Sequence, residues 1–269
     1  MLGLTPEMTI AFAHGTFNIA NTIVQFPFIG LLAYLVTKII PGEDEVNKYE
    51  ALYLDRLLIT QAPAIALGNA KKELVHLASY AIQSLEASYA FFDKGDEKYF
   101  DKVEKYETAV NSIDEELTTY LIDISNESLS VSENEVLASV LDSVRDLERI
   151  GDLAVASANL SQHIHNKGIE FSETAKTELG DVYNRTHRIV LDSIRVVVDD
   201  DKVLAGQVIL RHEELEKLEK QLRKTHTKRL NNGECTAQAG INYVDYLSHY
   251  TRIADHAINL VEKVTEGVI

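Results

Sequence analysis

The sequence predicts an all-α protein: an apolar N-terminal transmembrane helix, followed by a six-helix up-down bundle built from two three-helix units. Three observations lead to this fold class. A run without charged residues extends from Met8 to Thr37. Long amphipathic stretches with little strand signal then continue to the end of the chain. Short sequences from the first half of that region return in its second half at a nearly constant offset.

The N-terminal segment is predicted to cross a membrane. Its uncharged run is longer than the roughly 20 residues that an α-helix needs to span a bilayer. No basic region precedes the run and no small-residue cleavage pattern follows it, which argues against a signal peptide. We therefore expect residues 1–41 to form a transmembrane helix in the cell (inner) membrane. Lys38 at its carboxyl end predicts that the rest of the chain lies in the cytoplasm.

Four polar residues in this apolar segment share one helical face, at offsets of four, seven and eleven. They are His14, Asn18, Asn21 and Gln25. A polar side chain that faces lipid is costly, so such residues usually face protein or water. The stripe either packs against other helices or lines a transport path. One helix cannot form a path, so the second interpretation requires helices from elsewhere.

The charge of the chain lies almost wholly outside this segment. Up to Pro41 the only charged residues are Glu7 and Lys38, so the net charge of −16 belongs to residues 42–269. So acidic a region disfavours nucleic acid as a partner, because phosphate contacts need clustered Lys and Arg. It favours metal cations or a basic partner. The single cysteine, Cys235, excludes a disulfide within the chain and a cysteine-based zinc site.

The acidic region is predicted to consist of a connector, residues 42–61, followed by a helical domain, residues 62–269. Pro63 suits the first turn of a helix. Each break between the later helices contains Gly or a cluster of Asp, Asn and Ser. Ser132 and Glu135 have the spacing of a capping box. Helices are predicted at 63–93, 97–125, 131–166, 172–199, 202–229 and 235–265.

Internal matches divide the helical domain into two units, at about 62–166 and 172–266. "AKKEL" at 70–74 returns as "AKTEL" at 175–179, an offset of 105. "DLERIGDLA" at 146–154 returns as "HYTRIADHA" at 249–257, an offset of 103. Because the matches follow in order at nearly one offset, we interpret the domain as a tandem repeat.

The third helix of each unit carries candidate metal ligands. Glu148 and Asp152 stand four residues apart, and such carboxylates repel unless a positive group lies between them. Carboxylates from facing helices of a bundle often share a metal ion. The alternative is that these are solvated charges neutralised by arginines such as Arg149. The predicted metal ligands are Glu148, Asp152, Asp255 and Glu262.

The histidines and the absence of enzyme motifs give weaker information about function than the carboxylates do. His249 and His256 flank the second motif and are weaker candidate ligands, whereas His212 has no partner pattern. No phosphate-cradling Gly-rich loop, nucleophile elbow or HExxH motif occurs, so we expect no enzyme activity. A carboxylate-bridged metal hydrolase or oxidase is an alternative, weakened because no ExxH motif appears in these helices.

"RDLERIGDLA" and "TRIADHAINLVE" resemble the paired signature of the PhoU family, and the resemblance covers about 62–268. It implies a six-helix bundle that regulates phosphate uptake and binds a divalent or trivalent metal ion through E/DxxxD motifs. Thr251 stands where the second motif has an acid, while Asp255, Asn259 and Glu262 match the remainder.

"AHGTFN" followed by "PF" resembles a helix of bacterial sodium/phosphate cotransporters, some of which carry a PhoU-like domain. This resemblance implies the C-terminal region of a sodium-dependent inorganic phosphate transporter, as a fragment, a split gene or a mis-called start that alone would not transport. Its partners would be inorganic phosphate, sodium and the remaining transporter helices, and a homodimer is left open. The alternative is a membrane-tethered PhoU-like phosphate-signalling regulator that acts on a separate transporter or sensor kinase.

Overall fold

The computed structural model describes residues 6–25 and 51–265, and every regular element in these ranges is an α-helix. The chain divides into two compact units, Met1–Asn47 and Lys48–Ile269, which are described separately below.

The described helix of the first unit is α1, Pro6–Gln25. His14, Asn18 and Asn21 are exposed along it, whereas the side chain of Gln25 and the rest of the uncharged run lie outside the described residues. Across 6–25 and 51–265, no helix combines the length and the apolar character that crossing a bilayer requires. The predicted cell-membrane localisation is therefore wrong, and the predicted transmembrane helix has no support within the described residues. The polar stripe contributes to this result, because it lowers the mean hydropathy of α1.

Within residues 51–265, the second unit contains one short and six long helices. The short helix, α3, lies in the predicted connector, where no helix was expected. Each of the six long helices begins and ends within two residues of its predicted bounds. The helices are α3 (Leu57–Gln61), α4 (Pro63–Lys94), α5 (Glu97–Ser125), α6 (Val131–Lys167), α7 (Glu173–Asp199), α8 (Lys202–Asn231) and α9 (Ala237–Thr265).

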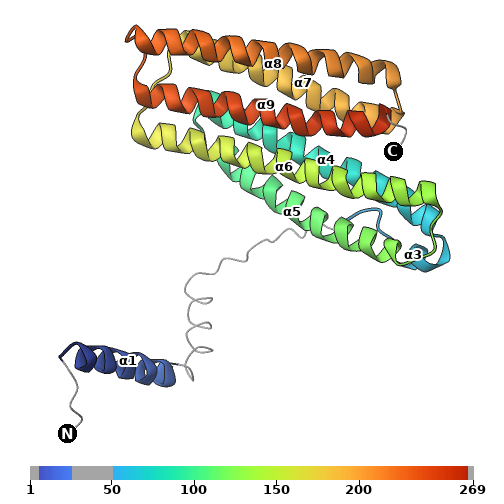
Figure 1. The fold of residues 1–269 in the computed structure, drawn as a ribbon, viewed down its shortest axis with the longest axis horizontal. Helices are drawn as coiled ribbons and strands as arrows, with labels where there is room; N and C mark the ends of the chain where they lie inside the picture. Colours follow the sequence, from blue (N-terminus) through green and yellow to red (C-terminus); the bar gives the residue numbers. More distant parts are fainter. Residues whose placement is uncertain (1–5, 26–50, 266–269) are drawn as a thin grey trace. The chain divides into compact units, whose positions relative to one another are not determined.

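The six long helices pack as two three-helix groups (Figure 1). Helix α4 packs on α5 and α6, and α7 and α8 pack on α9. The groups meet mainly where α6 lies beside α9, and α4 also contacts α7. The third helix of each repeat, which carries the predicted metal ligands, therefore lies at the centre of the bundle.

The core is formed by the apolar stripes of all six helices. Its largest fully buried side chains include Tyr120, Tyr243, Tyr246, Tyr250, Phe91 and Leu77. The rings of Tyr89 on α4 and Tyr183 on α7 stack with centroids 3.7 Å apart, which joins the two groups. Gly180 allows this approach, because a Cβ there would lie 2.9 Å from the Tyr89 hydroxyl oxygen.

A capping box is present at the start of α6, but its two residues lie two positions earlier than the predicted pair. Ser130 is the N-cap: its backbone N–H donates to Glu133 Oε2 at 2.7 Å, and Ser130 Oγ accepts from the Glu133 N–H at 3.3 Å. The expected pair, Ser132 and Glu135, was therefore wrong. The segment contains two overlapping Ser-x-x-Glu patterns, and spacing alone does not distinguish them.

The segment before α3 is hydrogen-bonded to one buried carboxylate on α4. The backbone N–H groups of Leu52 and Tyr53 both donate to Glu73 Oε2 at 2.8 Å. The other oxygen of Glu73 lies 2.7 Å from His76 Nδ1. The Glu73 side chain is fully buried, so these contacts supply the hydrogen bonds that a buried charge needs.

Candidate metal centre

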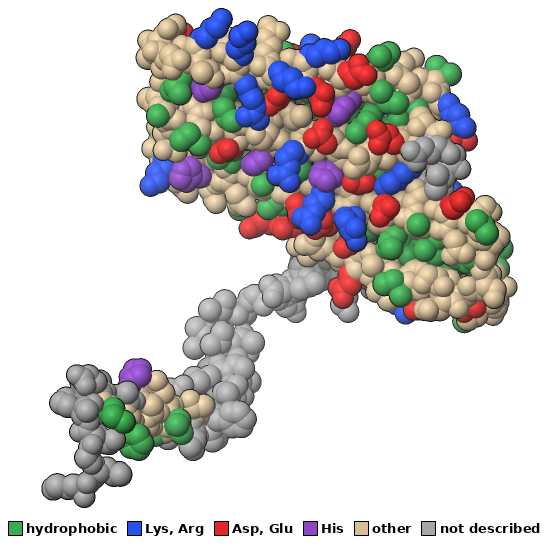
Figure 2. Space-filling model, viewed as in Figure 1, with side chains coloured by type: hydrophobic (Ala, Val, Ile, Leu, Met, Phe, Trp, Pro, Cys, Tyr) green, Lys and Arg blue, Asp and Glu red, His purple; other side chains and the backbone are tan. Residues whose placement is uncertain are grey.

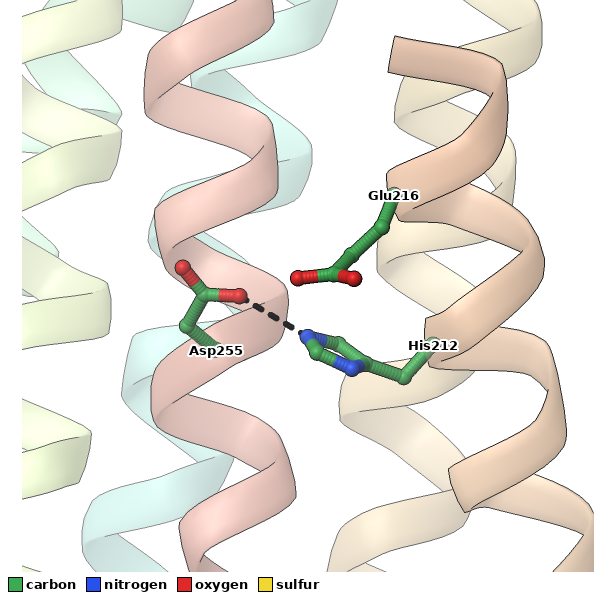
Figure 3. A group of neighbouring side chains, drawn as sticks. All are labelled: His212, Glu216 and Asp255. Carbon is green, nitrogen blue, oxygen red and sulfur yellow. Dashed lines mark hydrogen bonds and ion pairs between the residues drawn. The ribbon is translucent and has the colours of Figure 1, made fainter. Parts of the chain in front are cut away.

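The second three-helix group brings one imidazole and two carboxylates together. His212 and Glu216 lie one turn apart on α8, and Asp255 on α9 points toward them (Figure 3). His212 Nε2 lies 2.8 Å from Asp255 Oδ1. One ligand atom from each of the three residues lies within 4.8 Å of the others. Imidazole and carboxylate donors suit zinc, manganese or iron, so this donor set fits a metal ion.

The field around His212 favours positive charge. The hydrogen bond with Asp255 raises the pKa of His212, and the charges of Asp255, Glu216 and Glu262 act in the same direction. Burial opposes the shift. Glu262 contributes only through its charge: it is exposed, two turns beyond Asp255, and lies outside the three-residue group. Of the two ligands predicted in this unit, the structure brings Asp255 to the site and leaves Glu262 apart.

His212 and Glu216 are the site residues that the sequence reasoning missed. The internal repeat is the sequence feature that could have revealed His212. At the offset of 105, His212 corresponds to Glu107 on α5, and Asp255 corresponds to Asp152 at the offset of 103. The charge of Asp152 acts on Glu107, so the equivalent pair also lies close together in the first group. Extending the repeat alignment from α9 to α8 would have identified the histidine.

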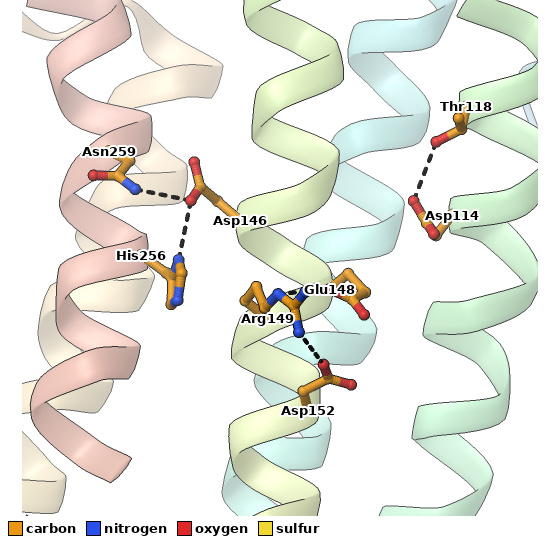
Figure 4. Close-up of polar contacts among 8 residues, drawn as sticks. All are labelled: Asp114, Thr118, Asp146, Glu148, Arg149, Asp152, His256 and Asn259. Atoms are coloured by element: carbon orange, nitrogen blue, oxygen red, sulfur yellow. Dashed lines mark hydrogen bonds and ion pairs between the residues drawn. The ribbon is translucent and has the colours of Figure 1, made fainter. Parts of the chain in front are cut away.

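The first group places Glu148 and Asp152 on α6 with an arginine beside them (Figure 4). Arg149 Nε lies 3.5 Å from Glu148 Oε2, and Arg149 Nη1 donates to Asp152 Oδ2 at 3.1 Å. Burial raises the pKa of Glu148; the charge of Asp152 adds to the shift and Arg149 opposes it. These contacts match the interpretation in which an arginine neutralises both carboxylates, and the metal site at Glu148 and Asp152 stays a prediction.

Helix α5 adds two carboxylates to this side of the bundle. Burial raises the pKa of Glu107, and the charge of Asp152 raises it further. Burial also raises the pKa of Asp114, against a hydrogen bond that Thr118 donates at 3.2 Å (Figure 4). These groups are more widely spaced than those in the second unit: within the described residues, only the group on α8 and α9 places three ligand atoms within 4.8 Å.

The two flanking histidines serve other contacts. His256 Nδ1 lies 3.1 Å from Asp146 Oδ1, to which Asn259 Nδ2 also donates at 2.8 Å (Figure 4). His249 Nδ1 lies 3.1 Å from Ser157 Oγ, and burial lowers the pKa of His249. Each histidine joins α9 to α6, so the structure gives these candidate ligands a place in the interface between the groups.

Charged side chains of both signs are interspersed over the face of the bundle that carries α6 and α9 (Figure 2). The net charge of −16 is therefore not spread over this face as one broad negative field. The metal assignment depends on the local grouping of donors rather than on the overall charge.

Two curated proteins are similar to this chain. One is "Phosphate-specific transport system accessory protein PhoU homolog 1" of Thermotoga maritima, 30% identical over 48% of this chain and 54% of that protein. The other is "Putative inorganic phosphate export protein YjbB" of Salmonella typhimurium, 22% identical over 68% of this chain and 34% of that protein. The chain thus spans about half the length of the first relative and about a third of the second.

Two solved structures share the fold. PhoU from Pseudomonas aeruginosa superposes with a TM-score of 0.66 at 21% identity, over 77% of this chain and 99% of that one. The phosphate transport system regulatory protein PhoU from Streptococcus pneumoniae gives 0.67 at 15% identity, over 76% and 95%. The expected PhoU-like fold is confirmed, while the sodium-dependent transporter stays a prediction. The PhoU domain model matches residues 74–160 and 179–264, most of both three-helix groups, and the chain therefore belongs to the PhoU domain family.

Proposed function

We propose that this protein regulates phosphate transport by binding, not by catalysis, and acts on a transporter encoded separately. Family membership supports this role, as does the similarity to a phosphate-specific transport accessory protein. The main expectation from the sequence, a region of a sodium-dependent transporter, has less support. It required a membrane-crossing helix, and the described residues contain none.

The observation that carries the proposal is the pair of equivalent polar sites on the two repeats. Asp152 and Asp255 occupy corresponding positions, and each faces an ionisable residue of the neighbouring helix. Two such sites in one bundle suit a protein whose packing responds to cations. The cofactor that we propose is a divalent or trivalent metal ion held by His212, Glu216 and Asp255. Once bound, it would supply positive charge between α8 and α9.

The site on α5 and α6 is the weaker of the two proposed metal sites. Glu148 and Asp152 supply two carboxylates, but Arg149 already contacts both. Binding of a cation there requires the Arg149 guanidinium to move, and its side chain is 54% exposed, so it has room to do so. We therefore expect the second group to bind metal more tightly than the first.

Phosphate uptake in a strain that lacks the gene tests the proposed role. Uptake rates are compared at scarce and plentiful external phosphate. We expect the deletion to change how uptake depends on external phosphate, and a plasmid copy of the gene to restore that dependence. Identical dependence with and without the gene would contradict a regulatory role in phosphate transport.

A further inference from the structure

A groove of about 580 Å³ lies on the α7–α8 face of the bundle. Three arginines line it, Arg185 and Arg188 from α7 and Arg211 from α8. Asn184 and His187 on α7 add polar groups to its lining. So many guanidinium groups in one groove are unexpected in a chain with a net charge of −16.

One buried carboxylate organises the arginines. Asp192 on α7 is only 2% exposed. Arg188 Nε donates to Asp192 Oδ2 at 2.7 Å, and Arg211 Nη1 donates to the same oxygen from α8. Arg195 Nη1 lies 3.6 Å from the other oxygen. Three guanidinium groups thus surround one carboxylate, which fixes the direction of Arg188 and Arg211 where they line the groove.

The repeat shows that the fold does not need this arrangement. At the offset of 105, Asp192 corresponds to Ala87, Arg188 to Gln83 and Arg211 to Tyr106. Ala87, Gln83 and Tyr106 line the equivalent groove on α4 and α5. The first unit therefore packs the same place without a buried charge. Because a buried carboxylate paired with arginines often adds no stability over apolar packing, stability alone does not account for these arginines.

The groove retains donors for a ligand. Arg188 uses Nε for Asp192, and Arg185 uses Nε for Asp181 at 3.1 Å. Within the described residues, no hydrogen bond or ion pair engages the terminal nitrogens of these two arginines, or the side chain of Asn184. Guanidinium groups whose direction is fixed by a carboxylate bind oxyanions with paired hydrogen bonds.

Two carboxylates in the lining of the groove limit the size of the ligand. Asp181 and Glu214 line the same groove. They would repel an extended polyanion such as nucleic acid or an anionic lipid surface, while a small anion fits between the arginines. The recognised chemistry is therefore a single tetrahedral oxyanion.

We propose that this groove binds inorganic phosphate, with Arg185 and Arg188 as direct donors and Arg211 held in place by Asp192. The choice of phosphate among oxyanions rests on the proposed function. The oxyanion site itself rests on the arginines, their buried carboxylate and the equivalent groove of the first unit, which has no arginine in its lining.

Calorimetric titration of inorganic phosphate into the full chain, after removal of metal by a chelator, tests the site. The Arg185→Gln/Arg188→Gln variant removes both donors and leaves Arg195 and Arg211 on Asp192. The matched control is Lys217→Gln/Lys224→Gln, which removes the same charge from exposed positions of α8 outside the groove. We expect saturable binding to the wild type, weakened about tenfold or more in the first variant and by less than about twofold in the control.

Three results would overturn the proposal: no saturable binding to the metal-free wild type, equal losses in both variants, or sulfate binding at least as tightly as phosphate. Melting temperatures of both variants establish that they are folded before titration. A failed titration would contradict the phosphate groove but not the regulatory role, which the uptake of the deletion strain tests. An absent uptake phenotype would contradict the regulatory role but would not change the result of the titration. The two failures are therefore distinguishable.

Discussion

The carboxylate of Asp146 on α6 lies 3.0 Å from the ammonium group of Lys263 on α9, so a largely buried ion pair joins the two three-helix groups. The side chains are 13% and 16% exposed, and His256 and Asn259 complete the surroundings of the carboxylate. The halves of the repeat are therefore joined by a polar contact as well as by their apolar core.

Replacing Asp146 with Ala is expected to lower the free energy of unfolding by about 3 kcal/mol or more, because Lys263 would stay buried without a counter-charge. Urea denaturation measures the change. Asp142→Ala is the matched control, since Asp142 is exposed one turn earlier on α6. An Asp146→Ala/Lys263→Met variant should recover part of the loss. Equal stability of the Asp146 and Asp142 variants would contradict this assignment.

Glu73→Ala is expected to release the segment before α3 from α4. The N–H groups of Leu52 and Tyr53 would lose their acceptor, at a cost of roughly 1–3 kcal/mol for each group that stays buried without a partner. Hydrogen exchange at these two amides should therefore quicken while the core helices stay protected. The control is Glu116→Ala, because Glu116 is exposed and accepts only a long contact of 3.4 Å from the Ala51 N–H. The prediction fails if exchange at Leu52 and Tyr53 is unchanged.

Glu178 is expected to contribute to acid sensitivity. Burial disfavours its charged form, but hydrogen bonds from Arg229 and Tyr243 outweigh burial and lower the pKa of Glu178. A carboxyl with a lowered folded-state pKa stabilises the fold above its unfolded-state pKa. That contribution is lost as the pH falls through the lowered value.

The free energy of unfolding measured against pH checks this expectation. Glu178→Gln should be less stable than the wild type near neutral pH and should lose less stability as the pH falls. Parallel curves for the two proteins would mean that the contacts of Glu178 do not stabilise its charged form. Glu173→Gln is a suitable control, since Glu173 is exposed on the same helix.

The three-residue group on α8 and α9 is expected to determine the metal content of the purified protein. Asp255→Ala and His212→Ala each remove one ligand and should reduce bound metal well below the wild-type amount, measured by mass spectrometry. Glu262→Ala should retain it, because Glu262 lies outside the group. If the wild-type protein contains no metal, or if the variants retain it, the contact between His212 and Asp255 is an ordinary solvated ion pair and not part of a metal site.

Helix positions could be predicted because each long helix carries an apolar stripe over many turns and ends at a Gly or a polar cluster. Gly95 and Gly168 end α4 and α6 with positive φ, as such breaks predict. The membrane prediction counted charges over residues 8–37, whereas in the described part of that run His14, Asn18 and Asn21 lower the mean hydropathy of α1. The capping box was misplaced because two overlapping patterns satisfy the same rule.

The site was only partly predictable, because its partners come from different helices. Asp255 was found from the repeated motif on α9. His212, 43 residues earlier, follows no local pattern and becomes a neighbour only when α8 packs on α9. The groove arginines were missed for the same reason: Arg211 reaches Asp192 across a helix pair, over 19 residues. Periodicity predicts which face of a helix is buried, but not which polar residues of two faces meet.

Phosphate uptake in the deletion strain, complemented by the wild-type gene or by a His212→Ala/Asp255→Ala variant, tests the central claim most directly. The account predicts that the wild-type gene restores the dependence of uptake on external phosphate, and that the variant, present at equal abundance, does not. Full restoration by the variant would contradict a metal-dependent regulator. Uptake that is the same with and without the gene would contradict regulation of phosphate transport altogether.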